Sequence, residues 1–243
     1  MSSRSYQAIG TICLIKQKDK KIAQELLADY SRFKSVYYAG NISGQLRTPN
    51  VQWLAGEKNT LAKVKENNCE ILVDISKVMF SRGNQEEKRR IVSQIKGKED
   101  ILDMFAGIGY FTIPIAKLTD AHVWAIELNP DAIELLKHNI KLNKIQDKVK
   151  IICGDSKIEA LSLNKKFDRI HMGYFPGTYS FLPTALKVTK KGAIIHFHEL
   201  AEDSQEIIDK IKKIEPAIVI QKTTKVKKYG RKTWHWAIDL QKK

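Results

Sequence analysis

Three acidic residues stand at the ends of successive apolar segments between residues 100 and 155. Asp103 ends the run ILD, Glu127 ends HVWAIE, and Asp155 follows KIICG. If these segments are parallel strands, their carboxyl ends meet at the edge of the sheet where ligands bind. A carboxylate at the second strand could accept hydrogen bonds from both ribose hydroxyls, and one at the third could accept the amino group of adenine. The pattern therefore indicates an adenosine-containing ligand.

A glycine turn follows the first of these segments. The order Asp103-x-Phe105-x-Gly107-x-Gly109 leads an apolar strand into a helix, and glycine lets the backbone approach a ligand closely. Dinucleotide-binding folds use a similar turn, but their third glycine is replaced here by Thr112. The acid also precedes the glycines, where it could receive the ammonium group of a methionine moiety. These features favour S-adenosylmethionine (SAM) over NAD, with contacts from Phe105 and Gly107.

Strand-like and helix-like segments alternate around this turn. We expect strands at residues 100–104, 121–127, 149–153, 167–172 and 191–198, and helices at 110–117, 131–143, 178–188 and 203–213. AIVIQKTTKV and KTWHWAIDL, with the turn KKYGR between them, predict a final antiparallel hairpin. The expected fold is α/β, a class I SAM-methyltransferase-like (Rossmann-like) doubly wound sheet. We assign residues 1–80 to a small α+β domain, 81–98 to a connecting basic helix, and 99–243 to the catalytic domain.

The charge balance indicates a polyanionic partner. Lys and Arg total 42 against 27 Asp and Glu, a net charge of +15, which attracts nucleic acid. A lysine-rich surface of a heat-adapted protein is the alternative. The tail KTTKVKKYGRKTWHW suits phosphate contact and base stacking, although Trp234 and Trp236 could equally pack on the sheet.

Several protein classes are disfavoured by the sequence. No apolar run approaches the ~20 residues that cross a bilayer, and the N-terminus does not resemble a secretory leader. The three cysteines are odd in number and far apart, which favours a reducing cytoplasm. His196 and His198 alternate on one strand face, but without a third ligand we expect no metal site.

Several segments of the chain resemble those of a known family. GQLRTPNVQWLAGE, FSRGNQEEKRRI, DMFAGIGYFTIPIA, HMGYFPGTYSFL and IIHFHE are similar to the archaeal tRNA wybutosine-synthesising aminocarboxypropyltransferases, sisters of the tRNA guanine-N1 methyltransferases. Met172, Gly173 and Tyr174 stand where the methyltransferase branch has Asn-Leu-Pro. The resemblance implies SAM contacts from Ser81, Lys88 (with Arg89 as the alternative), Glu127, and Asp155 with Ser156.

The resemblance also implies a reaction. The 3-amino-3-carboxypropyl group of SAM would pass to carbon 7 of 4-demethylwyosine at position 37 of tRNA(Phe), in the anticodon loop, with release of methylthioadenosine. The small domain would then be a possible tRNA contact. The alternatives are SAM-dependent tRNA guanine-37 N1-methylation and a non-catalytic tRNA-binding module, with an NAD-dependent dehydrogenase as a distant third.

The proton-handling groups are less clear from the sequence. His198 and Glu199 end the predicted fifth strand, facing the expected cleft, and His171 is in the fourth. Histidine is the commonest general base. We predict catalytic roles for His198, Glu199 and Tyr174, the last by stacking on the tricyclic base beside the small Gly173.

Overall fold

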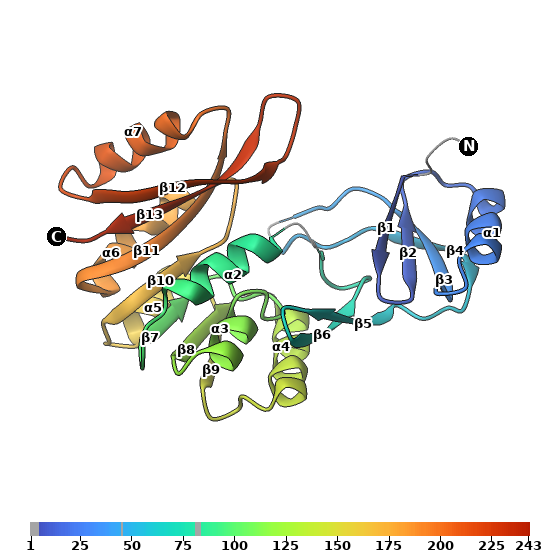
Figure 1. The fold of residues 1–243 in the computed structure, drawn as a ribbon, viewed down its shortest axis with the longest axis horizontal. Helices are drawn as coiled ribbons and strands as arrows, with labels where there is room; N and C mark the ends of the chain where they lie inside the picture. Colours follow the sequence, from blue (N-terminus) through green and yellow to red (C-terminus); the bar gives the residue numbers. More distant parts are fainter. Residues whose placement is uncertain (1–4, 45, 81–83) are drawn as a thin grey trace.

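The computed structural model describes residues 5–44, 46–80 and 84–243. Its larger part is built on a seven-stranded sheet in the order β12-β13-β11-β10-β7-β8-β9 (Figure 1). The strands are β7 (Asp100–Asp103), β8 (His122–Glu127), β9 (Val149–Cys153), β10 (Phe167–Met172), β11 (Thr189–Ala201), β12 (Val219–Lys228) and β13 (Trp234–Gln241). Strands β7 to β11 pair in parallel, and β13 runs antiparallel to both neighbours. The predicted α/β fold with its C-terminal antiparallel hairpin is confirmed.

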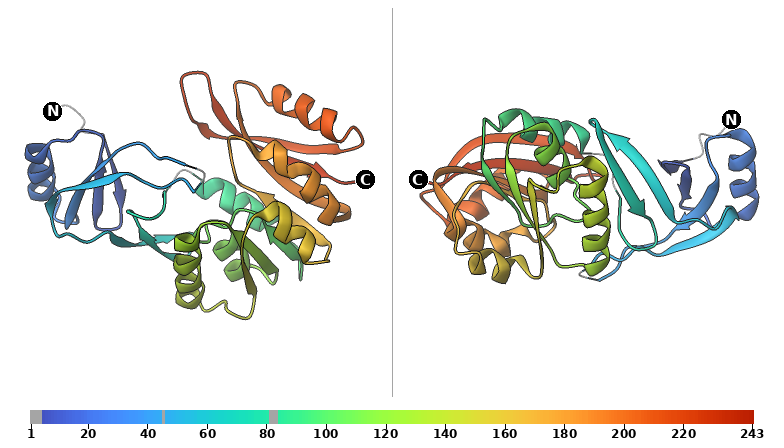
Figure 2. Two further views of the ribbon diagram at one scale, coloured as in Figure 1. Left: turned by 180° about the vertical axis from the view of Figure 1, so that it is seen from behind. Right: turned by 90° about the horizontal axis from the view of Figure 1, so that it is seen from below.

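Helices cover both faces of this sheet (Figure 2). The helices are α2 (Gln85–Gln94), α3 (Thr112–Leu118), α4 (Pro130–Asn143), α5 (Ser156–Ser162), α6 (Leu182–Val188) and α7 (Ser204–Ile214), with the short 3-10 helix η1 (Thr178–Phe181) before α6. Neighbouring residues of β7 divide between the two cores, because side chains alternate along a strand. Ile101 packs with α2, α3 and α4, whereas Leu102 packs with α5, α6 and α7.

Two helical segments differ from the sequence prediction. Helix α5 was not predicted, because its seven residues are too few to show a clear period. The single helix predicted over residues 178–188 is divided into η1 and α6. Pro183 stands in the first turn of α6, a position that proline tolerates because its missing N–H has no partner there.

The N-terminal part has a sheet of its own. Strands β1 (Tyr6–Ile9), β2 (Ile12–Ile15), β3 (Ser35–Ala39) and β4 (Val51–Gly56) form it in sequence order, and α1 (Lys20–Asp29) packs on it. Leu26 of α1 is buried with Cys13, Val36 and other apolar residues in a separate small core. One face of this sheet therefore has a core of its own, whereas Ile9, Ile12 and Tyr37 belong to the larger core.

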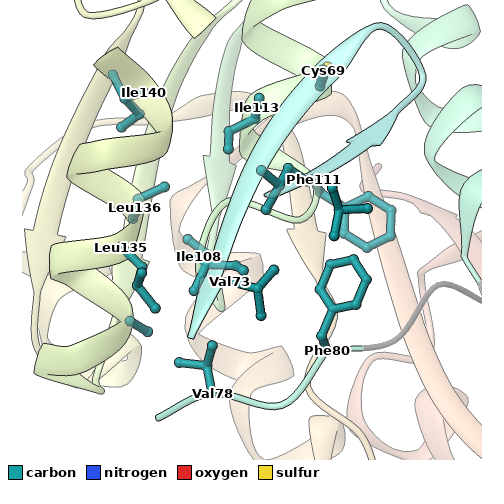
Figure 3. Packing of buried hydrophobic residues seen from close by; sticks show 14 of the residues in the cluster. Cys69, Val73, Val78, Phe80, Ile108, Phe111, Ile113, Leu135, Leu136 and Ile140 are labelled. Carbon is teal, nitrogen blue, oxygen red and sulfur yellow. The ribbon is translucent and has the colours of Figure 1, made fainter. Parts of the chain in front are cut away.

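A two-stranded hairpin lies between the two parts (Figure 1). It consists of β5 (Leu61–Glu66) and β6 (Cys69–Asp74). Val73 packs toward Ile108 and Leu136 in the core of α3 and α4 (Figure 3). The side chain of Asn139 in α4 accepts from the backbone N–H of Leu72 at 2.6 Å and donates to its carbonyl at 3.0 Å. From residue 61 on, the hairpin thus packs against the larger part, while the domain boundary at residue 80 stays a prediction.

The longest helix in the described part of the chain is α4, with 14 residues. No helix of residues 5–44, 46–80 and 84–243 is long and apolar enough to cross a membrane.

Candidate active site

A cavity of about 600 Å³ opens at the carboxyl ends of the parallel strands. Residues of the loops after β7, β8, β9 and β10 line it, and Arg47 of the N-terminal part and Tyr229 of the final hairpin contribute at its margin. Its size falls within the usual range for a small-molecule site. The place is the one where parallel α/β sheets bind ligands.

Glu127 lies at the wall of this cavity, at the end of β8. Its Oε2 accepts from the N–H of Gly107 at 2.7 Å and its Oε1 from the N–H of Asn129 at 2.8 Å. Burial raises the pKa of Glu127 above the ordinary glutamate value. Gly107 has φ 55°, and a Cβ there would lie 2.7 Å from the ring of Tyr110. The glycine turn and the acid therefore form one rigid unit facing the ligand space.

Asp155 and Ser156 line the next part of the wall, at the start of α5. Asp155 accepts from the N–H of Lys157 at 2.8 Å, which fixes its side chain at the edge of the cavity. The hydroxyl of Ser156 is buried and has no hydrogen-bond partner. Phe105 also lines the cavity, and its ring stacks on that of Tyr174 with centroids 5.2 Å apart.

Lys88 and Arg89, the two predicted basic contacts, lie on different faces of α2. Lys88 is buried and lines the cavity, with its ammonium 2.9 Å from Glu66 Oε2. Arg89 is exposed and borders a different depression beside β12. Ser81 lies outside the described residues.

Asp103 does not line the cavity, contrary to the prediction that it would contact the ligand. It is buried beneath the glycine turn. Its Oδ2 accepts from the hydroxyl of Thr112 at 2.7 Å, and its Oδ1 accepts from the N–H of Phe105 at 3.3 Å and lies 3.1 Å from His171 Nδ1. Thr112 explains this difference. It stands in place of the third glycine, and its hydroxyl donates to the carboxylate of Asp103.

His198 and Glu199 also lie away from the cavity, contrary to the expectation that they face it. The ring of His198 is buried, with its Nδ1 2.9 Å from His235 Nε2 and its ring centroid 5.8 Å from that of Phe111. Burial lowers the pKa of His198 well below its usual range. Glu199 Oε2 accepts from the N–H groups of Gly177 and Thr178 at 2.9 and 3.1 Å. Glu199 thus holds the loop after β10 in place.

Tyr174 lines the cavity as predicted, but its ring already has partners. Phe105 stacks on it, and the guanidinium of Arg47 lies 4.7 Å from its centroid. Arg47 also donates to the carbonyl of Phe175. A residue of the N-terminal part is therefore fixed to the loop after β10.

His171 lines the cavity, although it was not among the residues predicted to be catalytic. It lies in β10, and its Nε2 is buried without a hydrogen-bond partner. Asn84 Oδ1 is a further buried atom in the cavity wall that has no partner among the described residues. With the Ser156 hydroxyl, these atoms give the wall unsatisfied hydrogen-bonding capacity, as a site for a polar ligand requires. The sequence signal that could have pointed to His171 was the small residue Gly173, two positions later. In the structure, a Cβ at Gly173 would lie 2.7 Å from His171 Cε1.

The final hairpin combines exposed basic side chains with half-buried tryptophans. Lys225 lies 4.2 Å from the ring of Trp234 and 4.9 Å from that of Trp236, whose Nε1 donates to the carbonyl of Ala201 at 3.3 Å. Among the described residues, no group of three or more His, Cys, Asp and Glu side chains is placed to hold a metal ion.

The parallel sheet, the glycine turn and the acid that ends β8 together define a class I SAM-methyltransferase-like fold. The family described as the TRM5/TYW2 methyltransferase domain matches residues 62–226. The chain belongs to this family. The match begins within the β5–β6 hairpin, which packs against the larger part.

Individual relatives come from both branches of the family. A tRNA(Phe) (4-demethylwyosine(37)-C(7)) aminocarboxypropyltransferase of Methanocaldococcus jannaschii is 35% identical, and the alignment covers 96% of each chain. The structure of Pyrococcus horikoshii TYW2 in complex with MeSAdo has a TM-score of 0.83 at 30% identity, covering 98% of this chain and 90% of that one. The structure of an aTrm5 complex with tRNALeu has a TM-score of 0.88 at 30% identity, covering 99% of this chain but 72% of that one.

Proposed function

We propose that the protein transfers the 3-amino-3-carboxypropyl group of SAM to carbon 7 of 4-demethylwyosine at position 37 of tRNA(Phe), with release of methylthioadenosine. The observation that carries this proposal is the aminocarboxypropyltransferase relative that aligns over 96% of both chains. The cavity described above supplies the residue types that the donor requires.

Each part of SAM has a matching group in the wall. Glu127, Asp155 and Ser156 line the cavity. Glu127 would accept from the ribose hydroxyls, and Asp155 with Ser156 would bind the adenine. Lys88 is the buried cation available to the methionine carboxylate. Gly107 leaves the backbone open, and Phe105 gives an apolar surface. Asp103 acts at one remove, through Thr112 and His171.

Orientation of the donor is the main task of these residues. The sulfonium of bound SAM makes three adjacent carbons electrophilic. Lys88 would hold the methionine carboxylate and Glu127 the ribose, on the two sides of the sulfonium, so that the γ-carbon and not the methyl carbon faces the base. Positioning of this kind contributes ~7–11 kcal/mol to a two-substrate reaction.

The tRNA itself would meet a basic margin of the cavity. Lys227 and Tyr229 line it from the final hairpin, and Lys228, Arg231 and Lys232 are exposed nearby. Replacing Lys228 and Lys232 by alanine should weaken tRNA binding and reduce the slope of log affinity against log salt by about 1 for each lost phosphate contact. SAM affinity should remain that of the wild type.

The second candidate is guanine-37 N1-methylation. It is favoured by the TM-score of 0.88 to the aTrm5 structure. Against it, Met172, Gly173 and Tyr174 stand where the methyltransferase branch has Asn-Leu-Pro.

One experiment separates these functions. The protein is incubated with tRNA(Phe) that carries 4-demethylwyosine, and with SAM labelled either in the carboxyl carbon or in the methyl group. Aminocarboxypropyl transfer places only the carboxyl label on tRNA and yields methylthioadenosine. Methyl transfer places only the methyl label there and yields S-adenosylhomocysteine. Salt-sensitive tRNA binding without either product would indicate a binding module.

A further inference from the structure

His171 is one of the titratable groups of the cavity that the proposed SAM contacts leave unused. It is the only histidine among the described residues that line the cavity. Its side chain is 2% exposed, and its Nε2 has no hydrogen-bond partner. An unpartnered nitrogen at a ligand cavity is a candidate for proton transfer.

Asp103 determines which nitrogen of this ring carries the proton. Its Oδ1 lies 3.1 Å from His171 Nδ1, and its Oδ2 accepts from the Thr112 hydroxyl. Because a carboxylate can only accept, Nδ1 donates to it and the lone pair of the neutral ring is on Nε2. The same relation between a carboxylate and a histidine orients the general base of serine hydrolases.

The ring of His171 is held on two further sides. Phe111 packs against it, with centroids 3.9 Å apart at an interplanar angle of 33°. A Cβ at Gly173 would lie 2.7 Å from Cε1 and 3.4 Å from Nε2. A side chain at Gly173 would therefore press on the edge of the ring that bears the buried Nε2.

The two carboxylates of the cavity wall are less suited to this role. Glu127 accepts from two backbone N–H groups, and Asp155 caps α5. They end β8 and β9, which lie on the opposite side of β7 from β10. A base that takes a proton from the RNA would have to lie away from the adenosine contacts, as His171 does.

We infer that His171 Nε2 accepts the proton that leaves the modified ring carbon, with Asp103 as the positioning residue; this role rests on the proposed function. A π-electron pair of the ring forms the bond to the γ-carbon of SAM. The carbon–sulfur bond breaks, and its pair goes to sulfur, which leaves as the neutral thioether. The carbon–hydrogen pair returns to the ring as the proton moves to Nε2, and Asp103 stabilises the resulting imidazolium.

The test replaces His171 by alanine, with His138→Ala as the matched control because His138 is exposed on α4. Under saturating SAM and tRNA, the His171 variant should lose ~10²–10⁴-fold in single-turnover rate, with SAM affinity within about 2-fold of the wild type. Added imidazole should restore part of the rate, and more basic substituted imidazoles should restore more. His138→Ala should react like the wild type.

A second variant guards against a folding defect. The amide of His171→Asn can still donate to Asp103 but provides no base, so it should be slow and should show a primary isotope effect with the ring carbon deuterated. Two results with an active wild type would overturn the role of His171 but not the proposed function. One is a His171→Asn rate near that of the wild type. The other is a His171→Ala variant that binds SAM but is rescued by no imidazole. A wild type that releases no methylthioadenosine would overturn the proposed function, and this step with it.

Discussion

The ammonium of Lys88 lies 2.9 Å from Glu66 Oε2, and both side chains are 3% exposed or less. The pair joins the end of β5 to α2 at the wall of the cavity. Glu66 Oε1 has no hydrogen-bond partner, and Lys88 Nζ lies 5.9 Å from the ring centroid of Tyr110. The charge proposed to hold the methionine carboxylate is therefore also paired with a carboxylate of the protein.

Removal of Glu66 should destabilise the fold. Glu66→Ala leaves the ammonium of Lys88 buried without a partner, and breaking a buried ion pair in this way costs ~3–5 kcal/mol. Urea unfolding without SAM should show the loss, since a bound ligand would mask it. An unfolding free energy within 1 kcal/mol of the wild type, on the order of the error of such extrapolations, would mean that Lys88 can turn out to solvent.

The double variant Glu66→Leu, Lys88→Met separates stability from binding. Replacing both charges with apolar side chains of similar volume is often neutral for stability, so most of the unfolding free energy should return. SAM binding should nevertheless fall by about 10- to 100-fold, as a lost hydrogen bond to a charged group would cause. Calorimetric titration with SAM measures this, and unchanged affinity would remove Lys88 from the cofactor site.

Substitution of Glu127 should act mainly on the cofactor. Glu127→Ala should weaken SAM binding by about 100-fold or more, because the ribose hydroxyls lose a charged acceptor. The N–H groups of Gly107 and Asn129 also lose their acceptor, so the glycine turn should loosen. Equilibrium dialysis with labelled SAM tests the prediction, and retained affinity would exclude Glu127 as a ribose contact.

The pH dependence of SAM binding should depend on the same carboxylate. Burial raises the pKa of Glu127, so lowering the pH protonates it earlier than an ordinary glutamate and SAM affinity should fall. For the unliganded fold the sign is opposite. The contribution of Glu127 to stability is complete below the ordinary glutamate pKa and is lost as the pH rises through the raised one.

Two buried histidines should make the fold sensitive to acid. Burial lowers the pKa of His196 from 6.5 to about 4 and that of His235 from 6.5 to about 3. The unfolded chain therefore binds more protons than the folded one between pH 6.5 and 4, and stability should fall as the pH is lowered through this range. Urea unfolding at several pH values should show the decline, and His235→Gln should make it shallower. A constant unfolding free energy from pH 6.5 to 4 would contradict the prediction.

The strand pattern and two residues of the cavity wall were accessible from the sequence. Alternation of apolar strands with helical segments predicted the five parallel strands. The strand-end position of Glu127 and Asp155 predicted two residues that line the cavity, because the chemistry of a strand end is local. Helix α5 was missed because a seven-residue helix carries little periodicity.

The predictions that failed concern residues whose neighbours come from other segments of the chain. Asp103 stands at a strand end like Glu127, yet Thr112 and His171 take its oxygens. His198 is enclosed by Phe111, His171 and His235, which no spacing in the sequence indicates. Which histidine faces the cavity depends on the lateral order of the strands, and a single sequence does not contain it.

Gly173→Ala should test whether the transfer rate depends on the position of the His171 ring. The added methyl group would lie 2.7 Å from His171 Cε1, closer than carbon atoms approach without displacement, so the ring must turn away from Asp103. We expect at least a ~10-fold loss of transfer rate, the order of effect that follows from misplacing a base, with SAM affinity near wild type because the adenosine contacts lie beyond β7. Gly230→Ala is the matched control, since its nearest neighbour, Thr233, is 3.6 Å away. Equal rates for both variants would show that the ring of His171 can shift without consequence, and that the reaction does not depend on its orientation.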